Sequence, residues 1–190
     1  MTYFRSFFSQ LQRLLILNRL KDIKLIVCDV DGVLTDGGLY YDPDGLVSKR
    51  FDVHDGIAVR MLQHSGITLA FISGGKSGAT VSRAQDLDIK YCYVNVKDKT
   101  KILKQLCSDL NILFSETAFI GDDLNDLPVK FIPVFLAVPS DAVKALRSKA
   151  DWVLSSSGGH GAFRELSDAI LASKGKLNNF NRFGMIHSNN

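Results

Sequence analysis

The stretch Lys24-Leu-Ile-Val-Cys-Asp-Val-Asp-Gly-Val-Leu-Thr-Asp36 decides the fold. Its first part, residues 25–28, is wholly apolar and rich in β-branched side chains, which is typical of a strand buried on both faces of a parallel sheet. Asp29 and Asp31 follow at once. Because side chains alternate along a strand, these two carboxylates point to the same side where the strand ends.

Two carboxylates this close together repel each other, and burying them requires a compensating cation. Mg²⁺ is a suitable cation because it takes oxygen ligands and commonly uses only one or two carboxylates together with phosphate oxygens. A solvated turn between a strand and a loop explains the same residues without a metal. A bare Asp-x-Asp-Gly does not separate these two interpretations.

Length and composition indicate one globular domain. The chain has 190 residues, 46% of them hydrophobic and 23% charged, and contains no polar or low-complexity tract typical of disorder. The net charge of +3 is small, and no basic stripe with interleaved aromatic residues is evident outside the tail. We therefore expect no nucleic-acid partner.

The cysteines and the apolar runs predict a cytoplasmic protein with no membrane partner. Cys28, Cys92 and Cys107 form no C-x-x-C pair, and each lies in an apolar context, which favours buried free thiols in a reducing compartment. The apolar run at residues 14–17 is too short for a membrane span or the core of a signal peptide, and no small-residue cleavage site follows it.

The chain divides into three parts. Residues 1–21 predict a helical extension, because apolar side chains recur at three- and four-residue spacings over residues 3–20. Residues 22–174 form the predicted domain. Residues 175–190 are rich in asparagine, and their composition predicts a mobile tail.

Within the domain, predicted strands alternate with predicted helices. A tight turn at residues 42–45 predicts a β-hairpin flap between residues 39 and 47. Further strands are expected at residues 68–72, 91–94, 117–120, 135–138 and 151–154, and helices at about 52–66, 77–87, 97–107, 140–149 and 162–174. This order predicts an α/β fold with a doubly wound, Rossmann-like parallel sheet. Ligands bind outside the carboxyl ends of the strands in such sheets.

The polar residues that follow the predicted strands are therefore expected to meet at one crevice, at the carboxyl ends of those strands. Ser73 ends one predicted strand, Lys99 opens the helix after another, and Asp122, Asp123 and Asp126 follow a third. Together with Asp29 and Asp31 they fit a phosphoryl-transfer site. A carboxylate nucleophile there attacks phosphorus, while a metal ion, a lysine and a hydroxyl share the phosphoryl charge.

Position along the chain suggests the catalytic roles. Asp29 is the expected nucleophile and a metal ligand, and Asp31 is placed to protonate the leaving alkoxide and later to deprotonate water. Lys99 neutralises phosphate oxygens and is counted as catalytic, while Asp122 completes the magnesium shell.

The remaining polar groups have supporting roles. Ser73 and the Gly74 and Gly75 amides are expected to hold phosphate oxygens. Asp126 is expected to orient a metal-bound water or Lys99, and Asp123 is expected to do either.

Four ordered motifs resemble those of the haloacid dehalogenase superfamily of phosphatases. They are Asp29-Val-Asp31-Gly-Val-Leu-Thr, the apolar strand into Ser73-Gly, the Lys99 helix, and Gly121-Asp-Asp-Leu-Asn-Asp126. More narrowly, Phe51-Asp-Val-His-Asp-Gly-Ile-Ala-Val-Arg60 and Ser157-Gly-Gly-His-Gly-Ala-Phe-Arg-Glu165 are similar to segments of the 3-deoxy-D-manno-octulosonate 8-phosphate phosphatases. The similarity extends over roughly residues 22–173.

This resemblance implies a Mg²⁺-dependent phosphomonoesterase of lipopolysaccharide biosynthesis that acts on a phosphorylated sugar acid. It implies that the backbone carbonyl of Asp31 joins Asp29 and Asp122 as a metal ligand. It also implies a set of substrate-binding residues, namely His54, Asp55, Gly56, Arg60, Arg83, Asn125 and His160.

The spacing of the motifs predicts that no cap domain covers the site. The intervals from Asp31 to Ser73 and from Ser73 to Lys99 are too short for one once the predicted strands and helices are subtracted. The resemblance implies a homotetramer in which a neighbour's hairpin and C-terminal segment close the open site. Residues 158–163 or the tail would then act in trans.

Three residues depart from the family pattern. His54, Gly75 and His160 stand where the family usually carries arginine, and neutral histidine does not clamp a carboxylate bidentately as arginine does. The substrate is therefore less well defined than the reaction. Three alternatives remain: a phosphatase for a nine-carbon keto acid of the sialic acid 9-phosphate type, a noncatalytic oligomerisation partner of a nucleotide-sugar synthetase, and a receiver-like phosphoacceptor.

Overall fold

The computed structural model describes residues 14–45, 47–76 and 78–185. Residues 14–21 are helical, so the described end of the predicted N-terminal helix has the expected conformation. The rest of that prediction, at residues 3–13, lies outside the described part of the chain. No helix among the described residues is long and apolar enough to cross a membrane.

A six-stranded parallel sheet forms the centre of the domain, as the alternating pattern predicted. The strands are β1 (Leu25–Cys28), β4 (Thr68–Ile72), β5 (Tyr91–Tyr93), β6 (Thr117–Ile120), β7 (Phe135–Val138) and β8 (Trp152–Val153). They lie in the order β5-β4-β1-β6-β7-β8. The apolar run of β1 is buried along its whole length, with Val27 paired to Ala70 of β4 and to Phe119 of β6.

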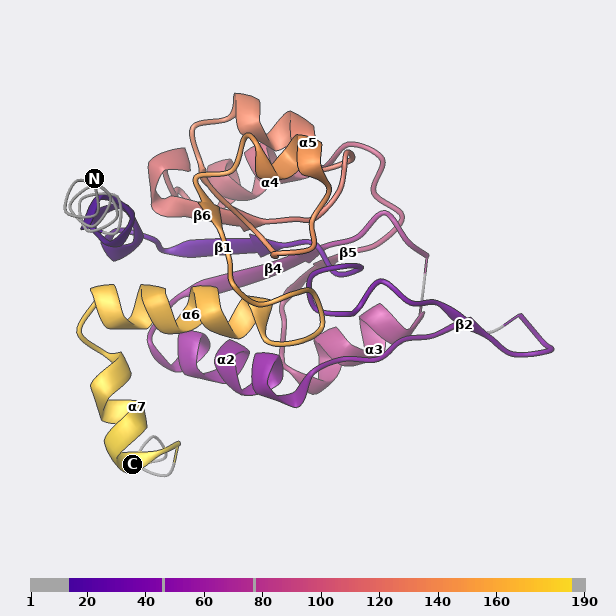
Figure 1. Cartoon of the computed structure of the whole chain (residues 1–190), viewed down its shortest axis with the longest axis horizontal. Helices are drawn as coiled ribbons and strands as arrows, with labels where there is room; N and C mark the ends of the chain where they lie inside the picture. Colours follow the sequence, from indigo (N-terminus) through magenta and orange to yellow (C-terminus); the bar gives the residue numbers. More distant parts are fainter. Residues whose placement is uncertain (1–13, 46, 77, 186–190) are drawn as a thin grey trace, which may run out of the picture.

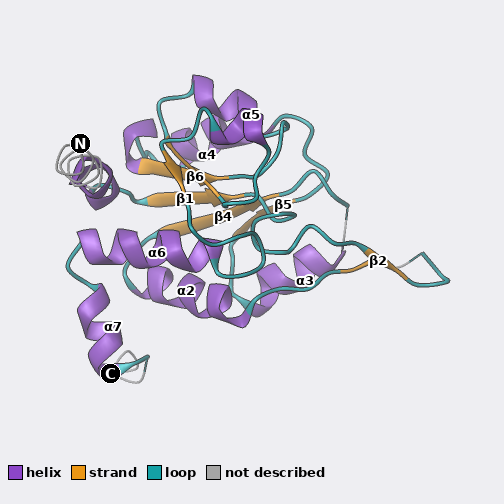
Figure 2. Ribbon diagram, viewed as in Figure 1, coloured by secondary structure: helices purple, strands orange, loops and turns teal. Residues whose placement is uncertain are grey.

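Helices cover both faces of this sheet, as Figures 1 and 2 show. Alternate residues of β1 explain the arrangement, because Ile26 and Cys28 belong to one hydrophobic cluster, and Leu25 and Val27 to the other. The first cluster packs against α2 (Val53–His64), α3 (Gly78–Asp86) and α6 (Ala162–Ser173). The second packs against α4 (Lys99–Asp109), α5 (Lys144–Arg147) and the 3₁₀ helix η2 (Leu127–Phe131).

The connection after β1 carries a β-hairpin. Its strands β2 (Tyr40–Tyr41) and β3 (Val47–Ser48) pair antiparallel, with Tyr41 opposite Val47. The hairpin projects well beyond the body of the domain (Figure 1). The described residues between β1 and α2 contain this flap and no further domain, as the spacing of the motifs predicted.

The position of β1 explains where the site forms. The chain runs from β1 to β4 and β5, then returns to β6 on the other side of β1. This reversal creates a switch point between β1 and β6, and ligands of open α/β sheets bind at such a point, outside the carboxyl ends of the strands. Asp29 and Asp122 follow β1 and β6 at this edge.

Three regions differ from the sequence-based expectation. The helix expected at residues 140–149 is shortened to α5, because the Val143 N–H instead donates to the Asp122 carbonyl at 2.9 Å and the Ser140 N–H to the Ser156 carbonyl at 3.0 Å. Short 3₁₀ helix η1 (Phe114–Glu116) and helix α7 (Leu177–Phe183) were not expected. The mobility of residues 175–190 and the three-part division of the chain stay predictions.

Candidate active site

Asp29 is the buried end of the central strand. Its N–H donates to the Ile120 carbonyl at 2.9 Å, which continues the pairing of β1 with β6. Its side chain then turns back, so that Oδ1 accepts from the Val30 N–H at 2.7 Å. Only 3% of Asp29 is exposed. The backbone therefore fixes Asp29 Oδ1, while Asp29 Oδ2 contacts the ammonium of Lys99.

Lys99 brings a buried ammonium to Asp29. It begins α4, whose N-cap is the Asp98 side chain, and its Nζ lies 2.8 Å from Asp29 Oδ2 and 2.6 Å from Asp126 Oδ1. Burial alone would lower the pKa of Lys99, but the two carboxylates outweigh burial and raise it. Lys99 therefore carries a positive charge at the place where the sequence predicted phosphate neutralisation.

Asp126 organises the acidic loop after β6. It is fully buried, and its Oδ2 accepts from the Asp122 N–H at 3.0 Å while its Oδ1 contacts Lys99. Both oxygens are thus engaged within the protein. This arrangement agrees with the predicted supporting role of Asp126, which fixes the loop and the lysine.

Three carboxylates gather where the sequence predicted a cation. One oxygen each from Asp29, Asp122 and Asp126 lies within 4.8 Å of the others. Burial, followed by the charge of Asp126, raises the pKa of Asp29 well above its usual range and that of Asp122 to about 7. One lysine does not balance three carboxylates, so this cluster fits a divalent cation held through Asp29 and Asp122. A role for the Asp31 backbone carbonyl stays a prediction.

Asp31 has partners that the sequence did not identify. Lys49 Nζ lies 2.7 Å from Asp31 Oδ1 and donates to Oδ2 at 2.9 Å, and it also donates to Thr80 Oγ1 at 3.1 Å. Ser73 Oγ donates to the same Asp31 Oδ2 at 3.2 Å. No spacing rule marks Lys49, because only the return of the hairpin carries it from β3 to the end of β1.

The predicted phosphate-binding residues lie beside this group. Ser73 is 1% exposed, directly after β4, and its Oγ accepts from the Gly75 N–H at 3.0 Å. Gly74 is exposed, and an added Cβ there would be 3.9 Å from Asn125 Nδ2. The fold therefore brings Asn125, from the acidic loop, next to the loop that begins at Ser73.

A crevice of about 410 Å³ opens between the hairpin and the loop after β4. The residues that line it come from three segments. They are Asp31 and Lys49, then Leu39, Tyr41 and Val47 of the hairpin region, and Gly75 and Lys76 of the loop after β4. Asp31, the expected proton donor, therefore faces this crevice. The hairpin thus forms one wall of this crevice, and its role in covering bound substrate stays a prediction.

The predicted substrate-binding residues of α2 do not join this crevice. Asp55 is 2% exposed, and its Oδ1 accepts from the Arg164 N–H at 2.8 Å, at the start of α6. The His54 side chain is 74% exposed and contacts the N-cap residue Asp52 at 2.9 Å. Arg60 is exposed further along the same helix. Substrate binding by these residues stays a prediction.

Gly56 and Arg83 have a packing role in the structure. The Arg83 guanidinium lies 5.7 Å from the centre of the Phe51 ring and donates to the Asp52 carbonyl at 3.4 Å. A side chain at Gly56 would collide with Arg83 Nη2. The two residues therefore fasten α3 to the start of α2, and their contact with substrate stays a prediction.

The side chains of Asp123 and His160 are not part of the acidic cluster, although the Asp123 N–H donates to Asp126 Oδ2 at 3.5 Å. Asp123 is exposed, and its Oδ1 accepts from the Leu124 N–H at 2.6 Å, so its carboxylate caps its own loop. His160 is exposed, and its Nδ1 lies 2.8 Å from the Gly158 carbonyl oxygen. The structure thus assigns both side chains to local loop contacts.

The two glycines before His160 pack against the loop that follows the nucleophile Asp29. The Gly159 N–H donates to the Val33 carbonyl at 2.9 Å, and side chains at Gly158 or Gly159 would overlap the backbone of residues 32–36. Arg50 adds a further tie by donating to the Gly159 carbonyl at 2.9 Å. A loop late in the chain therefore packs directly on the loop that follows Asp29.

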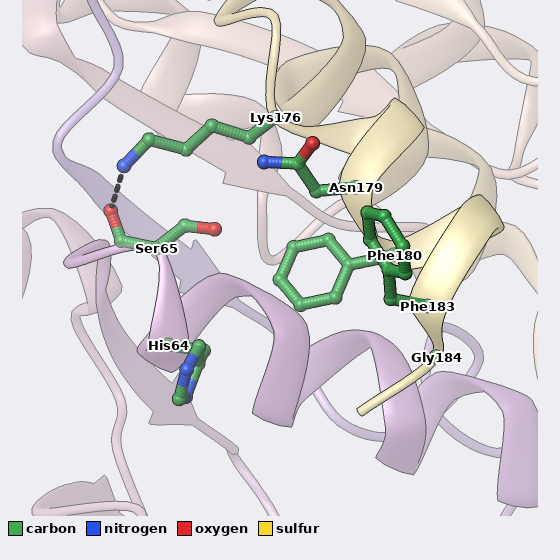
Figure 3. A pocket seen from close by; sticks show the side chains of 7 residues that line it. All are labelled: His64, Ser65, Lys176, Asn179, Phe180, Phe183 and Gly184. Atoms are coloured by element: carbon green, nitrogen blue, oxygen red, sulfur yellow. Dashed lines mark hydrogen bonds between the residues drawn. The ribbon is translucent and has the colours of Figure 1, made fainter. Parts of the chain in front are cut away.

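A second hollow, of about 590 Å³, lies between the end of α2 and α7 (Figure 3). His64, Phe180 and Phe183 line it, and the Lys176 ammonium donates to the Ser65 carbonyl at 2.8 Å. Since β4 begins just after His64, this hollow is at the amino ends of the strands. It is separate from the acidic cluster, which is at their carboxyl ends.

Comparison with known proteins finds close similarities, of which three are described below. The 3-deoxy-D-manno-octulosonate 8-phosphate phosphatase KdsC of Haemophilus influenzae is 40% identical over 162 residues, which are 85% of this chain and 90% of that protein. A Moraxella catarrhalis phosphatase of the same name, crystallised with magnesium, phosphate and KDO, is 36% identical with a TM-score of 0.84, covering 87% of this chain and 95% of that one. A Legionella pneumophila hydrolase assigned to haloacid dehalogenase subfamily III A is 36% identical with a TM-score of 0.87, covering 90% and 93%. No family model matches the chain.

The fold and the buried Asp29–Lys99–Asp122 arrangement define a phosphatase of the haloacid dehalogenase superfamily without a cap domain. Within it, the chain belongs to the family of the 3-deoxy-D-manno-octulosonate 8-phosphate phosphatases. The resemblance seen in the sequence motifs is thereby confirmed. The noncatalytic and receiver-like alternatives are not needed.

Proposed function

We propose that this chain hydrolyses the phosphomonoester of 3-deoxy-D-manno-octulosonate 8-phosphate through an aspartyl-phosphate intermediate, in lipopolysaccharide biosynthesis. The observation that carries the proposal is the Lys99 ammonium 2.8 Å from Asp29 Oδ2, inside a cluster that fits a divalent cation. Relatives that bear this substrate in their names are up to 40% identical over most of the chain.

The side chains divide the chemistry into two displacements. Asp29 attacks phosphorus, the bond from phosphorus to the sugar oxygen breaks, and Asp31 gives its proton to the leaving alkoxide. Asp31 then takes a proton from water as that water attacks the phosphorus, which releases Asp29 and inorganic phosphate. Lys99 and Ser73 stabilise the charge on the phosphoryl oxygens in both displacements.

Asp29 and Asp122 would hold magnesium in this site, and Asp126 would fix the loop behind them. When bound, the ion supplies positive charge that offsets the carboxylates and the phosphoryl group. The requirement follows from the donor set itself, because three carboxylates lie together and Lys99 supplies only one positive charge to them.

A phosphate-release screen with Mg²⁺ tests the substrate. We expect kcat/KM for 3-deoxy-D-manno-octulosonate 8-phosphate to exceed that for a sialic acid 9-phosphate and for simple sugar phosphates by at least about tenfold, which is 1.4 kcal/mol of transition-state discrimination. A preference for the nine-carbon acid would change the proposed substrate but leave the proposed reaction unchanged. Equal, weak turnover of all phosphates would remove the proposal.

We further propose a homotetramer in which a neighbouring chain closes the open site. The support is the projecting hairpin, whose Leu39, Tyr40 and Tyr41 are 47%, 58% and 69% exposed and would be covered by such an assembly. Light scattering of the purified protein measures the mass directly. A monomer with full activity would contradict this arrangement.

The three cysteines support a cytoplasmic location. Cys28, Cys92 and Cys107 are all free thiols, and Cys28 and Cys107 are buried. Free thiols are maintained in a reducing compartment. Fractionation of cells that express the chain at its natural level would test the location.

A further inference from the structure

Lys49 lies outside the acidic cluster, and its side chain is unusually buried for a lysine. Its side chain is only 1% exposed, although it follows a two-residue strand of a projecting hairpin. Lysine is rarely buried without a partner, because removing an ammonium from water is costly. The partner here is Asp31, the predicted proton donor.

Lys49 donates two hydrogen bonds, to Asp31 Oδ2 and to Thr80 Oγ1, and forms an ion pair with both oxygens of the Asp31 carboxylate. An ammonium has three N–H donors, and Lys49 Nζ has three oxygen neighbours: Asp31 Oδ1 at 2.7 Å, Asp31 Oδ2 at 2.9 Å and Thr80 Oγ1 at 3.1 Å. Thr80 is itself 1% exposed. The ammonium is therefore anchored between α3 and the Asp31 carboxylate.

Gly75 leaves the space that this arrangement needs. A Cβ at residue 75 would be 3.2 Å from Asp31 Oδ2, 3.3 Å from Ser73 Oγ and 3.6 Å from Lys49 Nζ. The first two distances are tighter than ordinary van der Waals contact. The missing side chain therefore allows the ammonium, the carboxylate and the Ser73 hydroxyl to lie together.

We propose that Lys49 is the positioning residue for Asp31, which it holds in line with the leaving oxygen through a paired contact anchored on Thr80. This inference rests on the two-step phosphatase reaction proposed above and adds a residue to it. Lys49 acts through Asp31 and does not touch the phosphoryl group. A misplaced Asp31 would fail to deliver its proton even though Asp29 and Lys99 remain in place.

The test compares two leaving groups. A sugar alkoxide needs a proton when it departs, whereas a nitrophenolate does not, so only the alkyl ester depends on a well-placed acid. The kcat/KM value covers the steps up to cleavage of the ester bond. For Lys49→Met we expect kcat/KM to fall at least about tenfold on a sugar phosphate and less than about threefold on p-nitrophenyl phosphate.

Matched variants separate positioning from general damage. Lys101→Met makes the same change at an exposed position of α4 and should leave both values unchanged. Thr80→Val removes only the anchor and should reproduce part of the selective loss. Lys49→Arg should restore part of the sugar-phosphate activity, because it keeps a cation that can contact both carboxylate oxygens. Circular dichroism and thermal unfolding establish that each variant is folded.

A double-mutant cycle completes the test. In an Asp31→Asn background, Lys49→Met should have little further effect on either substrate, because the group that it positions is already missing. Equal losses on both esters, a change in KM alone, or full additivity with Asp31→Asn would overturn the inference. The test compares the loss of kcat/KM on a sugar phosphate with the loss on p-nitrophenyl phosphate. Any sugar phosphate that the unmodified enzyme hydrolyses is suitable, so an error in the proposed substrate would not affect the comparison.

Discussion

The Asp122 carboxylate lies directly against the backbone of Gly32, so closely that a Cβ on residue 32 would overlap it. Gly32 also has a φ of +81°, in the left-handed region that glycine adopts most readily. The turn after the nucleophile strand and the acidic loop after β6 thus meet at a position without a side chain. This contact sets the distance between the two expected magnesium ligands.

Gly32→Ala is expected to abolish most of the phosphatase activity, by roughly a hundredfold or more, because Asp122 must move away from Asp29 and a displacement of about 1 Å can cost that much. Steady-state phosphate release measures the effect. Gly66→Ala is the matched control, since Gly66, just after α2, has a similar φ of +78° but nothing within 4 Å of an added Cβ. Similar losses in the two variants would show that backbone strain, not the Asp122 contact, is responsible.

Asp29→Asn should eliminate turnover and preserve the fold. The amide is a poor nucleophile, while its oxygen can still accept the Val30 N–H that holds Asp29 Oδ1 at 2.7 Å. We expect a loss of at least about a thousandfold in kcat and a nearly unchanged circular dichroism spectrum. Appreciable remaining activity, after contamination is excluded by a second purification, would remove Asp29 as the nucleophile.

Magnesium binding should release protons and strengthen as the pH rises. Metal ligands must be deprotonated, and burial raises the pKa of Asp122 to about 7 in the protein without a metal. Affinity is therefore expected to increase between pH 6 and pH 8. Calorimetric titration in two buffers of different ionisation enthalpy measures the protons, and Asp122→Asn should lose the binding. Identical affinity at both pH values would contradict the assignment of Asp122 as a ligand.

Asp55 is expected to make stability depend on pH. Burial raises its pKa from 3.8 to about 6, and its Oδ2 has no hydrogen-bond partner within the described chain. Between these two values the native state binds more protons than the unfolded state, so stability falls as the pH rises. The loss between pH 4 and pH 7 is roughly 2 kcal/mol, from 1.36 kcal/mol per pKa unit.

Asp55→Asn removes this charge and keeps an oxygen for the Arg164 N–H. The variant should therefore gain stability relative to the unmodified protein from pH 4 to pH 7, as measured by urea unfolding. Asp86→Asn, at an exposed position of α3, is the control for loss of a surface carboxylate. A difference between Asp55→Asn and the unmodified protein that does not change with pH would contradict the expectation.

The fold was largely predictable because its central strands are continuous apolar runs. The expected bounds at residues 25–28, 68–72, 117–120 and 135–138 agree with β1, β4, β6 and β7. Each run is buried on both faces, so hydrophobicity alone marks its limits. Helix α7 was missed because it is short and rich in asparagine, although Leu177, Phe180 and Phe183 recur at three-residue spacing and Leu177 and Phe180 pack against the core.

The site was predictable where motif order along the chain fixes the position of a residue. Asp29, Ser73, Lys99 and Asp122 follow strands or begin a helix, and the parallel sheet places such positions at one edge. The positions of Lys49 and Asp55 instead depend on tertiary contacts. Lys49 reaches Asp31 only through the hairpin, and Asp55 binds the start of α6, 109 residues further along the chain.

The packing of Gly158 and Gly159 on residues 32–36 has a consequence for synthesis of the protein. During translation, the nucleophile strand leaves the ribosome early, whereas the loop that backs it appears only after four-fifths of the chain has been made. The wall around Asp29 therefore cannot close while the chain is growing, and a nascent chain that stops before residue 159 should fold partly and remain inactive. Catalytic competence in this enzyme should thus arise only after residue 159 has been made.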